Sequence, residues 1–129
     1  MKNNNKIFLG EFIASCFLVM VIVGSGIMAE NLTNDNAIRL LANTIATGAG
    51  LFVLITAFAN ISGAHLNPFV SLSMYLTKRI KGKELLTFIP AQILGCLLGV
   101  MLANVFFEHS IIELSTKNSC LLYTSPSPR

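Results

Sequence analysis

Charged residues are scarce in this chain. Only 12% of its 129 residues are Asp, Glu, Lys or Arg, while 53% are hydrophobic. Soluble domains keep roughly 25% of their residues charged, so the composition and the mean hydropathy of +0.69 exclude an ordinary soluble domain. The formal net charge of +3 comes without a basic run interleaved with aromatic residues. We therefore expect no nucleic acid among its partners.

Patterns of reactive side chains are also missing. The three cysteines, Cys16, Cys96 and Cys120, share neither Cys-x-x-Cys nor His/Cys spacing, so we expect no disulfide framework, no metal site and no cofactor. No nucleophile, base and orienting group stand in a recognisable arrangement, so we expect no catalytic residues and no enzyme.

Long apolar runs are what the sequence does contain. They cover residues 7–29, 40–61 and 85–107, and each reaches the roughly 20 residues that a helix needs to cross a bilayer. The sequence therefore predicts an all-α membrane protein with three transmembrane helices. Glu11 is the one charge inside these runs. Because such a charge costs about 2.5 kcal/mol or more in a membrane, we expect it to face the protein interior.

Basic residues lie before the first run and between the second and third runs. They are Lys2, Lys6, Lys78, Arg79, Lys81 and Lys83. Basic loops stay on the cytoplasmic side, so we expect a multi-pass protein of the inner or plasma membrane with a cytoplasmic N-terminus.

A shorter apolar stretch lies between the second and third runs. Residues 67–76 would span about 15 Å as a helix, which is half a bilayer. Asn67 is a preferred N-cap and Pro68 suits a first turn, whereas residues 62–64 are small enough to run extended. We infer a re-entrant half-helix preceded by uncoiled backbone; a loop followed by an amphipathic surface helix is the alternative. Uncoiled backbone at membrane depth is tolerated where it lines a wet cavity, which favours a pore or a binding site.

Residues 62–70 read Ser-Gly-Ala-His-Leu-Asn-Pro-Phe-Val. This resembles the first pore motif of the major intrinsic protein family, the aquaporins and aquaglyceroporins, Ser-Gly-Ala-His-x-Asn-Pro-Ala-Val, at every fixed position but one. Glu11, residues 24–26 (Gly-Ser-Gly), and Gln92 followed by Gly95 also agree with the family. The resemblance covers about residues 7–107. It implies one repeat of an inverted-repeat fold, made of three spans and one half-helix.

The resemblance implies roles for the residues of this motif. Asn67, next to Pro68, would cap the half-helix and offer its amide to a passing solute. The carbonyls of Gly63, Ala64 and His65 would accept hydrogen bonds from it. His65 would brace the loop, with a proton relay or a ligand as the alternative.

Further residues receive roles in the same way. Glu11 would brace the loop amides, or else remain an interfacial residue. Thr47 stands twenty residues before Asn67, where the family places one contributor to its outer constriction. Its small side chain favours solutes larger than water; simple packing is the alternative. Phe69 replaces the usual Ala and could partly fill the pore. Gly95 and Gly99 form a Gly-x-x-x-Gly pattern that predicts close helix packing, within the protomer or between protomers.

A second Asn-Pro motif and three further spans are absent from this sequence. We therefore interpret residues 1–118 as the N-terminal half of a channel. Residues 119–129 do not continue the family pattern, and they look like translated vector sequence or a disordered tail. At full length the family is typically a homotetramer.

Two functions remain open. The chain is expected to be a truncated part of a passive channel for water, glycerol-like polyols or neutral metalloid hydroxides, in contact with lipid. Alternatively, it is a complete three-span structural or assembly subunit without transport activity.

Overall fold

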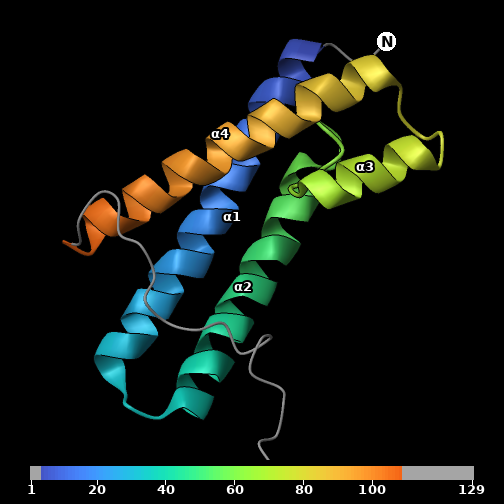
Figure 1. The fold of residues 1–129 in the computed structure, drawn as a ribbon. Coiled ribbons are helices and arrows are strands. Elements are labelled where there is room, and N and C mark those ends of the chain that lie inside the picture. Colours follow the sequence, from blue (N-terminus) through green and yellow to red (C-terminus); the bar gives the residue numbers. More distant parts are fainter. Residues whose placement is uncertain (1–3, 109–129) are drawn as a thin grey trace, which may run out of the picture.

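Four helices make up the part of the chain that the structure, a computed structural model, describes, which is residues 4–108. They are α1 (Asn4–Leu32), α2 (Asn36–Phe58), α3 (Pro68–Leu76) and α4 (Gly82–Phe106), and no strand occurs within this range (Figure 1). The three longer helices are long and apolar enough to cross a membrane. The prediction of an all-α protein with three spans and one short helix is thus confirmed.

Helices α1 and α2 run antiparallel, side by side (Figure 1). Helix α2 begins at Asn36 rather than near residue 40, because Asp35 caps it: the carboxylate accepts hydrogen bonds from Ala37 N at 2.8 Å and Ile38 N at 3.2 Å. It ends at Phe58 rather than near residue 61. There the Phe58 carbonyl accepts from Ile61 N and Ser62 N, which turns the chain out of the helix.

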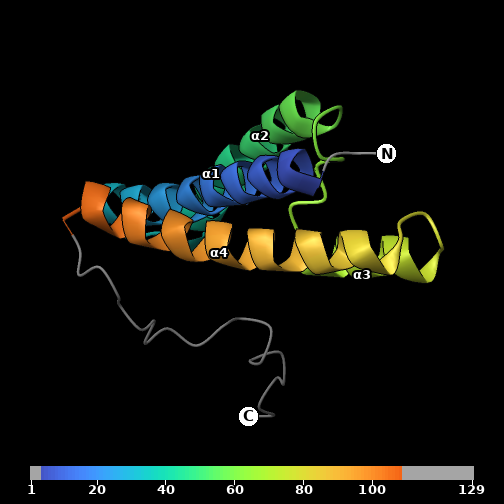
Figure 2. The same ribbon diagram turned by 90° about the horizontal axis from the view of Figure 1, so that it is seen from above.

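Helix α4 packs against α1 (Figure 2). A Cβ atom on Gly95 would overlap the carbonyl oxygen of Phe12, and one on Gly99 would overlap that of Cys16. The Gly-x-x-x-Gly pattern therefore serves packing within the protomer, where the absence of side chains lets two backbones meet.

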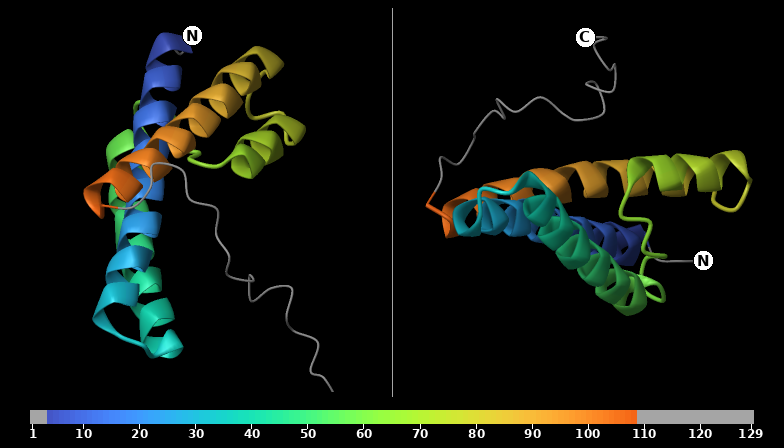
Figure 3. Two further views of the ribbon diagram at one scale, coloured as in Figure 1. Left: turned by 60° about the vertical axis from the view of Figure 1, so that its left-hand side comes forward. Right: turned by 90° about the horizontal axis from the view of Figure 1, so that it is seen from below.

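Helix α3 packs along the first part of α4, and the two are joined by a short connection (Figure 3). Its bounds agree with the predicted half-helix except that Asn67 is the cap and Pro68 the first helical residue. At nine residues it spans about 14 Å, too short to cross a bilayer.

The segment between α2 and α3 is uncoiled, but the prediction that it runs extended is wrong. Gly63 has φ 111°, Ala64 φ 50° and Leu66 φ 54°. These left-handed conformations fold the segment into a tight loop. The loop conformation follows from contacts with α1, described below.

Few large side chains are buried. In α2 only Leu54 is, and it packs with Ala14 of α1 and Leu66 of the loop. Bulky apolar residues such as Phe52, at 72% exposed, line the outer surface. Such a surface is stable in lipid, where outward-facing apolar side chains incur no hydration cost.

Candidate functional site

Glu11 is the centre of the site. It is fully buried on α1. Its Oε1 accepts hydrogen bonds from the Ser62 hydroxyl at 2.6 Å and from His65 N at 3.0 Å. Its Oε2 accepts from Leu66 N at 2.8 Å and from Gln92 Nε2 at 2.9 Å. All four partners donate, which matches a carboxylate because an ionised carboxylate only accepts.

The loop wraps around this carboxylate. Successive backbone amides of His65 and Leu66 point at the two oxygens, and Ala64 N donates to the Ser62 hydroxyl at 3.1 Å. Such a concave run of amides, with left-handed residues between them, is a recurrent way to bind an anion. Left-handed backbone costs about 1–2 kcal/mol for a residue with a side chain, so the hydrogen bonds to Glu11 offset the strain at Ala64 and Leu66.

A chain of polar side chains continues from Glu11 to the half-helix. Gln92 Nε2 also donates to Ser71 Oγ at 2.9 Å, and Ser71 Oγ lies 3.0 Å from Nδ1 of His65. The His65 ring stacks on Phe88 with a centroid distance of 4.1 Å. These contacts join α1, the loop, α3 and α4, so the position of the half-helix is fixed by side chains from all of them.

Asn67 caps α3 as its sequence suggests. Its Oδ1 accepts from Phe69 N at 2.8 Å. The side chain is exposed, and its Nδ2 donates to no residue between 4 and 108. Since the cap fixes the oxygen, the amide NH₂ group is presented outward as a donor. Pro68 occupies the first turn, where its missing N–H costs nothing.

The loop before Asn67 carries hydrogen-bond acceptors. Gly63 and Ala64 are half-buried, and within the described range no backbone N–H donates to their carbonyl oxygens. Two acceptors and one donor therefore lie within five consecutive residues of chain.

Thr47 is not brought into this cluster. It lies eleven residues before the end of α2, roughly 16 Å along the helix. It is on the face that meets α1, one turn after Asn43, whose Nδ2 donates to Ile22 O at 2.8 Å. The Thr47 hydroxyl oxygen is buried and has no hydrogen-bond partner among residues 4–108.

Phe69 projects from the first turn of α3 and is 81% exposed. No ring contact involves it in the described part of the chain. The ring is therefore exposed, as is the side chain of Asn67.

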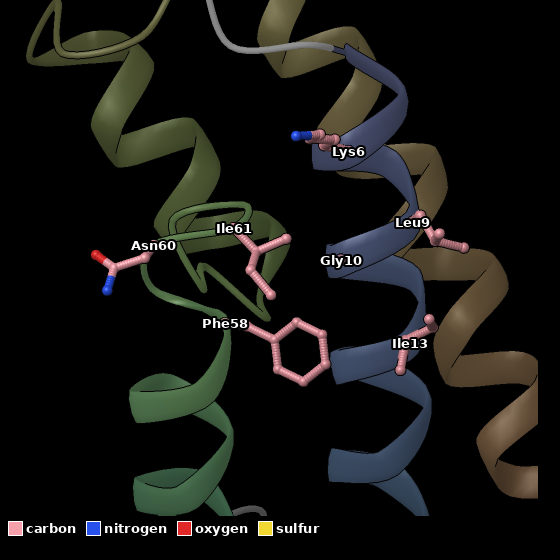
Figure 4. Close-up of a pocket in the computed structure, with 7 residues that line it drawn as sticks. All are labelled: Lys6, Leu9, Gly10, Ile13, Phe58, Asn60 and Ile61. Carbon is pink, nitrogen blue, oxygen red and sulfur yellow. The ribbon is translucent and has the colours of Figure 1, made fainter.

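A groove of about 450 Å³ lies between the start of α1 and the end of α2 (Figure 4). Its walls are mainly apolar, with Leu9, Ile13, Phe58 and Ile61 among them, and Lys6 stands at one end. Gly10 separates this groove from the loop, and a Cβ on Gly10 would lie 3.0 Å from Ser62 Cβ.

Ser62, Ser71 and Gln92 form a hydrogen-bonded set with Glu11 that no sequence pattern predicted. A signal existed for Gln92, because a polar side chain within an apolar span is costly unless it has partners. No spacing rule links Ser71 to Gln92, since their contact depends on how α3 lies against α4. Among residues 4–108, no group of three His, Cys, Asp or Glu side chains is placed to hold a metal ion.

Comparison with known proteins agrees with this geometry. The family model described as "Major intrinsic protein" matches residues 1–126. The chain is 43% identical over 109 residues to "Aquaglyceroporin AqpS" of Rhizobium meliloti (strain 1021), covering 84% of this chain and 47% of that protein. It is 37% identical over 118 residues to "Aquaporin TIP1-2" of Musa acuminata, covering 86% of this chain and 46% of that protein. It is also 37% identical over 94 residues to "Aquaporin A" of Dictyostelium discoideum, covering 73% and 34%.

The aligned regions span half or less of the length of these relatives. The similarity thus covers one part of each relative. The match to the family model, over residues 1–126, includes both the motif at residues 62–70 and the helix that carries Glu11.

Proposed function

The chain belongs to the major intrinsic protein family, and from that premise we propose that it forms one half of a passive channel for water and small neutral solutes. The observation that supports the proposal is the loop held on Glu11, which carries the carbonyls of Gly63 and Ala64 and ends at the capping residue Asn67. A neutral solute needs such donors and acceptors to replace part of its hydration.

The half-helix supplies the electrostatics. A helix N-terminus carries about half a positive charge, and the N-terminus of α3 begins at Pro68, directly after Asn67. A positive end that points into a pore repels cations, hydronium included. Together with a fixed donor, it favours neutral solutes over ions.

Two residues bear on the size of the solute. Thr47, if it contributes to the constriction as in the family pattern, leaves a wider aperture than a large aromatic residue would. Phe69 acts in the opposite sense, since its bulky ring is exposed in the first turn of α3, two residues after Asn67. We propose that solutes of glycerol size pass, at a rate limited by Phe69.

The surroundings of the channel follow from the same premise. The apolar outer surface supports a location within a bilayer. The basic residues before α1 and between α3 and α4 support a cytoplasmic N-terminus. We further propose that the full-length protein assembles as a homotetramer, as is typical of the family.

Stopped-flow swelling of vesicles tests this function. The product of the complete reading frame, reconstituted in liposomes, should accelerate glycerol entry over empty liposomes. Asn67→Asp should abolish the gain, because a carboxylate offers no donor, whereas Asn34→Asp in the loop between α1 and α2 is the matched control and should leave it unchanged. Flat traces for every neutral solute, water included, would overturn the proposal.

A further inference from the structure

The connection between α3 and α4, together with the first turn of α4, carries four basic side chains within six residues: Lys78, Arg79, Lys81 and Lys83. We call these four residues the basic connection. All four are exposed, and none forms an ion pair with a residue between 4 and 108. The one acidic residue nearby, Glu84, instead accepts from Lys81 N at 2.8 Å. The positive charge of this segment is therefore not neutralised within the described chain.

The basic connection lies at the edge of the apolar region. It joins the end of α3 to the start of α4, on the side of the molecule where α1 begins (Figure 1). Leu76 before it is 70% exposed and Leu86 after it is 76% exposed. Tyr75 lies against the connection, since a Cβ on Gly82 would come within 3.6 Å of its ring. Tyrosine flanked by apolar and basic residues is typical of the headgroup level of a bilayer.

Local folding does not account for cations at all four positions. Lys78 has φ 58°, a left-handed conformation in which glycine or asparagine is favoured. Lys81 and Lys83 stand at the N-terminus of α4, where the helix dipole disfavours positive charge. Lys78 and Arg79 follow the C-terminus of α3, where the dipole favours cations, so helix stability explains only these two, and an anionic partner would stabilise Lys81 and Lys83 as well.

We propose that the basic connection binds the phosphate-bearing headgroups of anionic lipids such as phosphatidylglycerol. Four cations at one level of the bilayer match a negatively charged leaflet. Each cation raises the binding constant for an anionic surface about fivefold. The apolar flanks, Leu76 and Leu86, reach the acyl chains beneath the same headgroups.

This binding also acts on the half-helix. Helix α3 packs on α4. The C-terminal end of α3, its outer end, is joined to α4 through the basic connection. Lipid bound there holds the outer end of α3 at the bilayer surface, while Glu11 holds the loop at its inner end.

Tyr75 offers a direct probe, because the chain contains no tryptophan and two tyrosines. A Tyr123→Phe background leaves Tyr75 as the single fluorophore. The chain is placed in phosphatidylcholine vesicles, which contain no other protein. A small fraction of the lipid carries a nitroxide label on its acyl chain, near the headgroup. In one sample the labelled lipid is phosphatidylglycerol, and in the parallel sample it is phosphatidylcholine. We expect labelled phosphatidylglycerol to quench Tyr75 with a relative binding constant at least fivefold above that of labelled phosphatidylcholine.

Charge variants separate this site from others. Replacing all four basic residues by glutamine should reduce the ratio to about one, while replacing the three lysines by arginine should preserve it. Lys6→Gln, a loss of charge on the same side outside the connection, should also preserve it. Far-UV circular dichroism verifies that each variant remains helical.

Equal quenching by the two labelled lipids would overturn the proposal. So would a ratio that survives the glutamine variant, since the attraction would then lie elsewhere. Inorganic phosphate at millimolar concentration should not displace the labelled lipid; full displacement would identify a site for free phosphate and overturn the assignment to lipid.

Discussion

Replacing Glu11 by Gln should destabilise the loop while changing the side-chain volume very little. The carboxylate accepts from four donors, two at each oxygen. An amide keeps one oxygen for Ser62 and His65, but it turns an NH₂ group toward Leu66 N and Gln92 Nε2. Two hydrogen bonds to a charged acceptor are lost, and donors then face donors in a buried site.

The magnitude follows from those two contacts. Hydrogen bonds to charged groups contribute about 1.5–3 kcal/mol each, so the loss amounts to about 3–6 kcal/mol. The neutral amide avoids the cost of burying a charge, which offsets part of this loss. We expect a decrease of about 3 kcal/mol in the free energy of unfolding.

Unfolding of the purified chain in mixed micelles, titrated with SDS and followed by far-UV circular dichroism, measures this decrease. Amide exchange at His65 and Leu66 should accelerate in parallel. Glu84→Gln is the matched control, because a glutamine also satisfies a capping box, and its unfolding free energy should stay within about 0.5 kcal/mol of the wild type. The reasoning is refuted if Glu11→Gln behaves like this control and leaves the two amides equally protected.

Three further predictions concern packing and conduction. Gly99→Ala should lower the unfolding free energy by about 1–3 kcal/mol, because the new Cβ overlaps the carbonyl of Cys16. Gly48→Ala is the control and should not lower the unfolding free energy, because its Cβ meets nothing within 4 Å. Equal effects of the two variants in SDS titration would contradict the packing described. Phe69→Ala should leave stability within about 0.5 kcal/mol because the ring is exposed, and it should raise glycerol flux through the full-length protein in the swelling assay. A reduced flux would show that the ring supports the pore instead. Thr47→Phe should lower glycerol flux more than water flux in the same assay, and equal reductions would place Thr47 outside the constriction.

The helices could be predicted from the sequence because apolar length alone determines what can span a bilayer. Their limits could not. Helix α2 starts four residues earlier than its apolar run, since the Asp35 cap, not hydrophobicity, sets its first turn. Helix α1 likewise continues through Glu30 to Leu32, beyond the end of its apolar run. Hydrogen bonds within the helix extend into polar residues that a hydropathy pattern leaves out.

The candidate site was accessible to sequence analysis only in part. The capping role of Asn67 follows from local chemistry, and the structure shows the cap directly. The hydrogen bonds from the loop amides to Glu11 could be predicted only through the resemblance to a family, because nothing near residue 11 indicates a loop more than 50 residues away. The left-handed backbone at Ala64 and Leu66 had no local signal at all, since neither residue favours that conformation.

The hydrogen bond between Glu11 and Gln92 also has a consequence for biogenesis. It joins residues 81 positions apart, and Ser71 receives its bond from the same Gln92 amide. The ribosome makes α1, α2 and α3 before it reaches Gln92, so the network around the loop cannot be completed until α4 is synthesised and inserted. During translation the loop can therefore bind Glu11 through its own amides, but it lacks the bonds from Gln92 until α4 is made.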